Sequence, residues 1–303
     1  MKFLVALVAW AVWWPAGQSA ALPLSDKDFK GTGRCQFAAH GFVLPAATER
    51  GINDSVQKLL ERHETAFGFQ TRPGFHLRIR VFARFEDYTN ATLSLYFTNA
   101  MEQRMFAGRM MNVAGFYAPQ TKEIVTWRQQ LPGVLGNTLL HEASHAIMDA
   151  HYDDVPLWLM EGSAEYFALV LYPLDELHQF LLRDRWTSLN RWLKENKLLP
   201  LATLLNADGA AFHQLDQEKA YAMSWSLFQL FMSPEVNRRA MLGLLHERQV
   251  PYRRKLDSAE QMARLYPGGL PRLEADWHAR IRAGAGITNS PNVKYIRVDP
   301  SKR

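Results

Sequence analysis

The spacing of apolar residues changes along the chain and predicts a mixed first half followed by a helical second half. Between Ala46 and Phe67, apolar residues recur every three to four positions among charged ones, which indicates an amphipathic helix that ends before Gly68. Between Phe75 and Phe82, apolar residues alternate with histidine or arginine. This alternation predicts a strand with one face in the core and the other toward solvent.

A helix, a β-hairpin and a second helix are expected in the middle of the chain. The first of these helices is predicted from Phe85 to about Gln103. Two short apolar stretches, 115–118 and 123–127, flank a turn that contains proline, which is typical of a hairpin. After a Pro-Gly pair, the second helix is expected to begin at Asn137 or Thr138.

From Pro156 onward the pattern becomes helical almost throughout. Helices are expected over 157–172, 175–195, 218–232, 234–248, 257–265 and 270–283. Residues 22–155 are therefore predicted to form an α/β subdomain with a small sheet, and 156–285 a helical subdomain, followed by a flexible tail over 286–303. The expected fold class is α+β, with an active site in the cleft between the two subdomains.

The N-terminus has the layout of a secretory signal peptide over residues 1–21. Lys2 supplies a positive charge, an unbroken apolar run extends from Phe3 to Trp14, and small residues follow up to Ala21. The twelve residues of this run are fewer than the roughly 20 that span a bilayer, so cleavage and export are expected instead of a membrane anchor. The mature chain is therefore expected in the periplasm or outside the cell, without stable insertion into a membrane.

The composition of the 303-residue chain narrows the classes of protein to which it can belong. Hydrophobic residues make up 48% of it, which permits a large core and argues against overall disorder. The net charge of +5 comes from small scattered clusters and not from a basic stripe, so no nucleic-acid partner is expected. Cys35 is the only cysteine, so neither an intrachain disulfide nor a cysteine-rich zinc site can form.

The strongest candidate for chemistry is the sequence His-Glu-Ala-Ser-His at 141–145. In a helix, His141 and His145 lie four residues apart on one face, where two imidazoles can bind one zinc ion. Glu142 lies beside that face and can act as a general base toward a metal-activated water. These three residues predict a Zn²⁺-dependent metallopeptidase centre.

Three downstream residues compete to be the third zinc ligand. His151 fits the spacing HExxHxxGxxH, but that layout needs a glycine where this chain has Met148, because the backbone must turn there. If the helix continues instead, His151 points away from His145. Glu161 and Glu165 lie one turn apart on the next predicted helix and share a face, so either carboxylate can approach the zinc ion.

These two stretches resemble the gluzincin metallopeptidases. The His-Glu-Ala-Ser-His sequence is followed, at 156–167, by Pro-Leu-Trp-Leu-Met-Glu-Gly-Ser-Ala-Glu-Tyr-Phe. This pair is most similar to the bacterial peptidase MA-like branch, which carries HExxH and then W-L-x-E-G-x-A-E-Y, and zinc aminopeptidases have a related W-L-N-E-G stretch. The resemblance is strong over residues 138–167 and weaker, but consistent in the order of elements, from about 75 to 280. It implies a zincin-like fold.

The resemblance also implies roles for single residues. The glutamate before the glycine is the family's third ligand and corresponds to Glu161, while an acid four residues later, which steadies a ligand histidine in thermolysin-like members, corresponds to Glu165. The interval from His145 to Glu165 matches the thermolysin-like spacing and the W-L-x-E-G context favours Glu161, so both stay open as ligands. Tyr221 resembles the family tyrosine that stabilises the oxyanion, and His213 is the competing donor.

The function implied is that of an exported zinc peptidase acting on peptide or protein substrates, with Glu142 as general base. An endopeptidase is expected, because no motif that binds a peptide amino terminus, which would mark an aminopeptidase, is evident. The predicted strand Gly115–Ala118 is the candidate for pairing with an extended substrate. The alternative is a catalytically inactive zincin-like protein that binds zinc or a peptide, or acts as a scaffold.

Overall fold

The computed structural model describes residues 26–31, 33–96, 113–129, 134–171, 176–232, 235–249 and 257–288. Its strands are β1 (Cys35–His40), β2 (Leu77–Phe82), β3 (Gly115–Ala118) and β4 (Glu123–Trp127). Its helices are η1 (Asp26–Asp28), α1 (Ala46–Phe67), α2 (Phe85–Leu95), α4 (Val134–His151), α5 (Leu157–Leu171), α6 (Glu176–Lys194), α7 (Leu201–Asn206), α8 (Gly209–Gln214), α9 (Gln217–Phe231), α10 (Glu235–Arg248), α11 (Ser258–Leu265) and α12 (Gly269–Thr288). The predicted signal peptide, 1–21, lies outside the described residues.

The described part of the chain is mainly helical and contains a small mixed sheet with the strand order β1-β2-β4-β3. β1 and β4 run parallel to β2, and β3 pairs with β4 in the antiparallel sense, which confirms the predicted hairpin. Parallel neighbours need long crossovers, and α1 and α2 lie in the segments that provide them. Within the described residues β3 forms one edge of the sheet.

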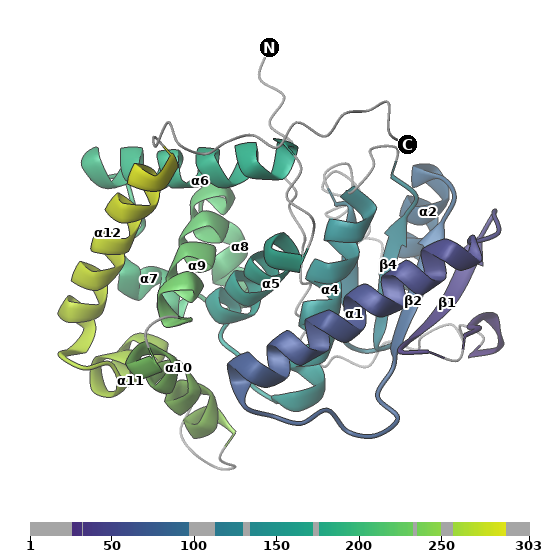
Figure 1. The fold of residues 1–303 in the computed structure, drawn as a ribbon, viewed down its shortest axis with the longest axis horizontal. Coiled ribbons are helices and arrows are strands. Elements are labelled where there is room, and N and C mark those ends of the chain that lie inside the picture. Colours follow the sequence, from purple (N-terminus) through teal and green to yellow (C-terminus); the bar gives the residue numbers. More distant parts are fainter. Residues whose placement is uncertain are drawn as a thin grey trace.

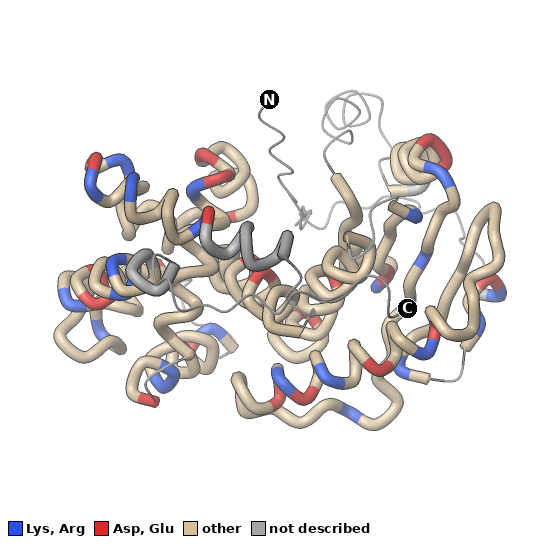
Figure 2. The backbone as a smooth tube through the Cα atoms, turned by 45° about the horizontal axis from the view of Figure 1, so that its top comes forward, with Lys and Arg blue, Asp and Glu red and all other residues tan. Residues whose placement is uncertain are grey.

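Helix α1 has the predicted bounds and the predicted division into two faces. Its buried face repeats at helical spacing and consists of Val56, Leu59, Leu60, His63, Ala66 and Phe67. Positive and negative residues alternate along its outer side (Figure 2). The helix ends at Gly68, whose φ of 73° is left-handed and whose N–H bonds to the carbonyl of Glu64, as is common where glycine closes a helix.

The sheet and the helical part share one hydrophobic core. In Figure 1 the sheet lies at the right with α1 and α2, helices α6 to α12 lie toward the left, and α4 and α5 lie between them. A single cluster of buried apolar residues extends from Cys35 in β1 to Ile281 in α12. A smaller cluster, which includes Phe82, Tyr88 and Phe116, fills the space between the sheet and α2. α4 and α5 are therefore held from both sides.

Several bounds differ from the sequence predictions. α4 includes Val134, so Asn137 and Thr138 are internal to it and do not start it. α2 ends at Leu95, with Tyr96 as its C-cap, and the rest of its predicted continuation, 97–103, falls on residues that are not described. α7 and α8 were not predicted, because six residues are too few to show a helical period. α12 continues to Thr288, into the predicted tail, whose remainder lies outside the described residues.

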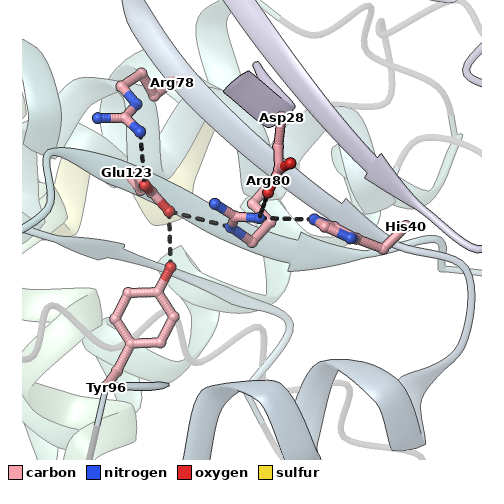
Figure 3. A network of polar contacts seen from close by, with 6 residues as sticks. All are labelled: Asp28, His40, Arg78, Arg80, Tyr96 and Glu123. Atoms are coloured by element: carbon pink, nitrogen blue, oxygen red, sulfur yellow. Dashed lines mark hydrogen bonds and ion pairs between the residues drawn. The ribbon is translucent and has the colours of Figure 1, made fainter. Parts of the chain in front are cut away.

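The second face of β2 is covered, so the prediction that it faces solvent is wrong. Arg80 is only 1% exposed, and its Nε donates to Oε2 of Glu123, on β4, at 3.1 Å. Arg78 lies 3.2 Å from Oε1 of the same carboxylate, and the Tyr96 hydroxyl donates to Oε2 at 2.8 Å (Figure 3). A further nitrogen of Arg80 lies 2.7 Å from Nε2 of His40. These partners compensate the hydration that the buried charges lose.

The single cysteine is enclosed in the core. Cys35, in β1, has no exposed surface, and its backbone N–H donates to the side-chain oxygen of Asn53 on α1 at 2.9 Å. Burial raises the pKa of the thiol to about 12. The thiol therefore stays protonated and has no contact with solvent in the folded chain.

Candidate metal centre

Helix α4 passes through the core, so its polar residues are buried together with its apolar ones. All residues from Asn137 to Met148 are buried. His141 and His145 are 2% and 1% exposed, and Glu142 has no exposed surface. A helix enclosed on every side is typical of a core position, and polar groups there need partners inside the protein.

Helix α5 packs between α4 and α9 and brings two buried glutamates, Glu161 and Glu165, toward α4. Its close approach to α9 depends on Gly162, since a Cβ atom at this position would lie 2.4 Å from the backbone oxygen of Ser224. α9 in turn carries Tyr221, which is buried and whose hydroxyl interacts with the carboxylate of Glu161. The consecutive helices α4 and α5 therefore meet the more distant α9 at this site.

The two histidines of α4 face the same carboxylate oxygen. Oε2 of Glu161 lies 3.3 Å from Nε2 of His141 and 3.6 Å from Nε2 of His145. The two imidazole rings are 4.7 Å apart between centroids and almost perpendicular. Ligand atoms of the three residues all lie within 4.8 Å of one another. The two nitrogens and the oxygen thus converge on one small volume.

His141, His145 and Glu161 form a buried group that could hold a metal ion. Nε2 of His141 and both ring nitrogens of His145 make no hydrogen bond within the described part of the chain. Buried nitrogens of this kind are rarely left without a partner in proteins, and a cation held between these three residues would provide one. Two imidazoles and one carboxylate are a donor set that suits zinc.

Glu165 lies on the other side of the His141 ring, and Arg185 lies behind it. Oε1 of Glu165 is 3.4 Å from Nδ1 of His141, the nitrogen that faces away from Glu161. Oε2 is 2.5 Å from the guanidinium of Arg185 on α6. Sequence reasoning did not identify Arg185, because nothing in the local pattern of α6 distinguishes it from the other arginines of that helix.

Burial keeps both histidines of the group neutral. It lowers the pKa of His141 to about 4 and that of His145 to about 3, and the nearby carboxylates oppose the shift only in part. Neutral imidazole is the form that binds a metal ion. Burial also raises the pKa of Glu142 well above its usual range, with the negative charge of Glu161 as the second cause and the backbone amide of Tyr117 opposing it.

Tyr221 is enclosed near the same three carboxylates. Burial is the main cause that raises the pKa of its phenol well above the usual value, and the charges of Glu161, Glu165 and Glu142 raise it further. The hydroxyl therefore keeps its proton at neutral pH and can donate a hydrogen bond. The structure thus brings Tyr221 to the metal-capable group, where the resemblance had placed a donor.

Other sequence candidates lie outside this group. His151 stacks on Phe69 with ring centroids 3.9 Å apart, at the far end of α4. His213, on α8, is not part of the group either. Asp149, one turn beyond His145 on α4, accepts hydrogen bonds from the hydroxyl of Tyr117 and from Lys122. It therefore ties α4 to the hairpin.

His63, on α1, is a buried polar residue that the sequence patterns did not single out. It has no exposed surface, and it packs against the ring of Phe167 on α5 at 4.3 Å. Its Nε2 lies 2.8 Å from the hydroxyl of Ser144, inside the His-Glu-Ala-Ser-His segment, and its Nδ1 lies 3.0 Å from the carbonyl of Leu59. Its position on the apolar face of α1 was the signal that could have identified it.

This histidine makes the stability of the fold dependent on pH. Burial lowers the pKa of His63 from 6.5 to about 3, so below pH 6.5 the unfolded chain binds a proton that the folded chain does not. The stabilisation is complete above pH 6.5 and is lost as the pH falls toward 3. Between pH 7 and pH 5, the free energy of unfolding of the wild type should fall by about 2 kcal/mol more than that of His63→Gln. Urea unfolding of both chelator-treated proteins at the two pH values measures this, and equal decreases would exclude His63 as the cause.

The sequence matches no model of a known protein family, and no curated protein is significantly similar to it. Among the described residues, no helix is both long and apolar enough to cross a membrane. The roles of the site residues therefore rest on their own chemistry and geometry.

Proposed function

We propose that this protein is an exported, zinc-dependent peptidase of the gluzincin type with a zincin-like fold. The observation that carries the proposal is the buried group of His141, His145 and Glu161. Glu142, which is also buried, follows His141 directly on α4. Hydrolysis of a peptide or protein substrate is the reaction that this set of residues supports best, because it unites a metal site, a base and a hydrogen-bond donor.

In the proposed reaction, His141, His145 and Glu161 would hold the zinc ion. When bound, zinc acts as a Lewis acid that polarises the scissile carbonyl and makes water more acidic. Glu142 then takes the proton of the attacking water and passes it to the leaving amine. Burial raises the pKa of Glu142 above the usual carboxyl range, and a general base works best when its pKa lies near the working pH.

Tyr221 and the residues behind His141 complete the proposed site. The phenol of Tyr221 donates a hydrogen bond to the oxyanion that develops on the substrate carbonyl, and its raised pKa keeps the donor protonated. Glu165 accepts the N–H of His141 at Nδ1, which leaves Nε2 free to bind the metal, and the ion pair with Arg185 holds the Glu165 carboxylate in place. The substrate backbone pairs with the edge strand β3.

Metal content tests the proposal most directly. We expect about one zinc ion per wild-type chain by elemental analysis of the purified protein, and less than about a tenth of that in His141→Ala. His246→Ala removes an exposed imidazole from α10 and serves as the control, which should keep its zinc. A wild-type protein that folds normally and binds no zinc, even after incubation with excess metal, would contradict the proposal.

Activity separates the proposed enzyme from its alternative. Wild-type protein loaded with zinc should cleave an unfolded protein such as casein, and His141→Ala should not. Zinc binding without cleavage of casein or of a mixed peptide library would instead favour a zincin-like protein that binds zinc or peptide without turnover.

A further inference from the structure

A cavity of about 350 Å³ lies next to the metal-capable group. His145 forms part of its wall, with neither ring nitrogen hydrogen-bonded within the described residues. Tyr117 and Pro119, at the end of the edge strand β3, also line the cavity. So does Met160, the residue that precedes Glu161. A peptide paired with β3 and crossing the metal-capable group therefore passes the mouth of this cavity.

The walls of the cavity combine apolar surface with an excess of negative charge. The apolar part includes Val155, Leu157, Met160, Leu205 and Ala207. The acidic part consists of Asp149, Asp154, Asp208 and Asp257. Among the described lining residues, Arg248 is the only cation. Its guanidinium is largely buried and is engaged by Asp154 at 2.9 Å and by Ser258 and Gln261 at 3.3 Å.

Two of the acids have no cation beside them among the described residues. Asp208 caps α8 by accepting the N–H of Ala211 at 3.1 Å, and Asp257 caps α11 by accepting the N–H of Ala259 at 2.8 Å. Both side chains are at the exposed rim of the cavity. The backbone N–H groups that these carboxylates accept are neutral, so capping places no cation beside them. Within the described residues, the rim therefore presents two carboxylates that attract a cation.

We propose that this cavity is a subsite for a lysine or arginine side chain of an extended peptide, which makes basic peptides the substrate class. The inference rests on the proposed peptidase function. The aliphatic stem of such a side chain matches the apolar walls, and its charged end reaches the rim formed by Asp208 and Asp257. An acidic side chain at the same position meets the like charge of these two carboxylates and is disfavoured.

The double variant Asp208→Asn/Asp257→Asn tests the subsite without removing the two helix caps, because asparagine caps helices as well as aspartate. Asp87→Asn/Asp276→Asn removes two charges from surfaces that do not line the cavity and is the matched control. The probes are short, fluorescently labelled, alanine-rich peptides that differ only in a central Lys, Leu or Glu. Binding is measured by anisotropy in a Glu142→Gln background, so that the peptides are not consumed.

We expect the Lys peptide to bind about tenfold more tightly than the Glu peptide, and this ratio to fall below about threefold in Asp208→Asn/Asp257→Asn. The control variant should keep the full ratio. No binding of the Lys peptide, equal affinity for all three peptides, or a ratio that the double variant leaves unchanged would overturn the subsite.

Hydrolysis of the same peptides by the chain that retains Glu142 distinguishes the two proposals. Cleavage of all three peptides at equal rates contradicts the subsite and supports the peptidase. A preference for the Lys peptide in binding, without cleavage of any peptide, contradicts the peptidase and supports the subsite.

Discussion

Glu142→Gln is expected to lower kcat for cleavage of casein or of a susceptible peptide by about 10²–10⁴-fold. The amide cannot accept the proton of the attacking water, whereas it has almost the same shape as the carboxylate. Glu142 is fully buried near the negative charge of Glu161, so a neutral side chain at this position should fold at least as well as the original. Zinc content should stay near that of the wild type.

The measurements are initial rates and elemental analysis on the same preparation. Glu260→Gln, an exposed residue on α11, is the control and should change neither quantity. If Glu142→Gln kept more than a tenth of the wild-type rate with full zinc content, Glu142 could not be the general base. Loss of zinc together with activity would instead assign it a role in holding the site.

Gly162→Ala is expected to lower the free energy of unfolding by about 3 kcal/mol, because the added methyl group collides with another helix. The nearest atom to the new Cβ, at 2.4 Å, would be the backbone oxygen of Ser224, and a backbone atom inside α9 cannot move aside as a flexible side chain can. α5 must therefore shift away from α9. Since Gly162 follows Glu161 directly, the same shift should also weaken zinc binding.

Gly51→Ala provides the matched comparison for this substitution. Gly51 lies within α1, is exposed, and has no atom within 4 Å of a built Cβ. Alanine there should raise the free energy of unfolding by about 0.5–1 kcal/mol, because it restricts the unfolded chain and favours helix. Urea unfolding should therefore show changes of opposite sign in the free energy of unfolding of the two variants. A Gly162→Ala protein as stable as the wild type would show that the approach of α5 to α9 is looser than described.

The elements with strong local patterns could be predicted from the sequence. α1 was identified with its bounds because its apolar residues recur regularly and Gly68 closes it. The hairpin of β3 and β4 was identified because its two short strands are separated by only a few residues. The histidines of α4 were paired because a spacing of four residues fixes their common face whatever the tertiary structure.

Contacts between distant segments could not be predicted in the same way. The parallel pairing of β1 with β2, and the covered face that buries Arg80, depend on how strands separated by a whole helix come together. Sequence also left Glu161 and Glu165 open as ligands, since both share one face of α5. In the structure Glu161 faces Nε2 of both histidines, whereas Glu165 lies against Nδ1 of His141.

The enclosed thiol of Cys35 gives this protein a reporter of its own opening. Alkylating reagents can reach it only when β1 separates from the sheet, and the chain has no second cysteine to confuse the signal. The rate of labelling therefore reports how often the native structure opens. Any ion or peptide that binds the folded chain alone must slow that rate in proportion to the population it protects. Alkylation of Cys35 can thus measure the occupancy of the metal-capable group, although this thiol is not part of that group.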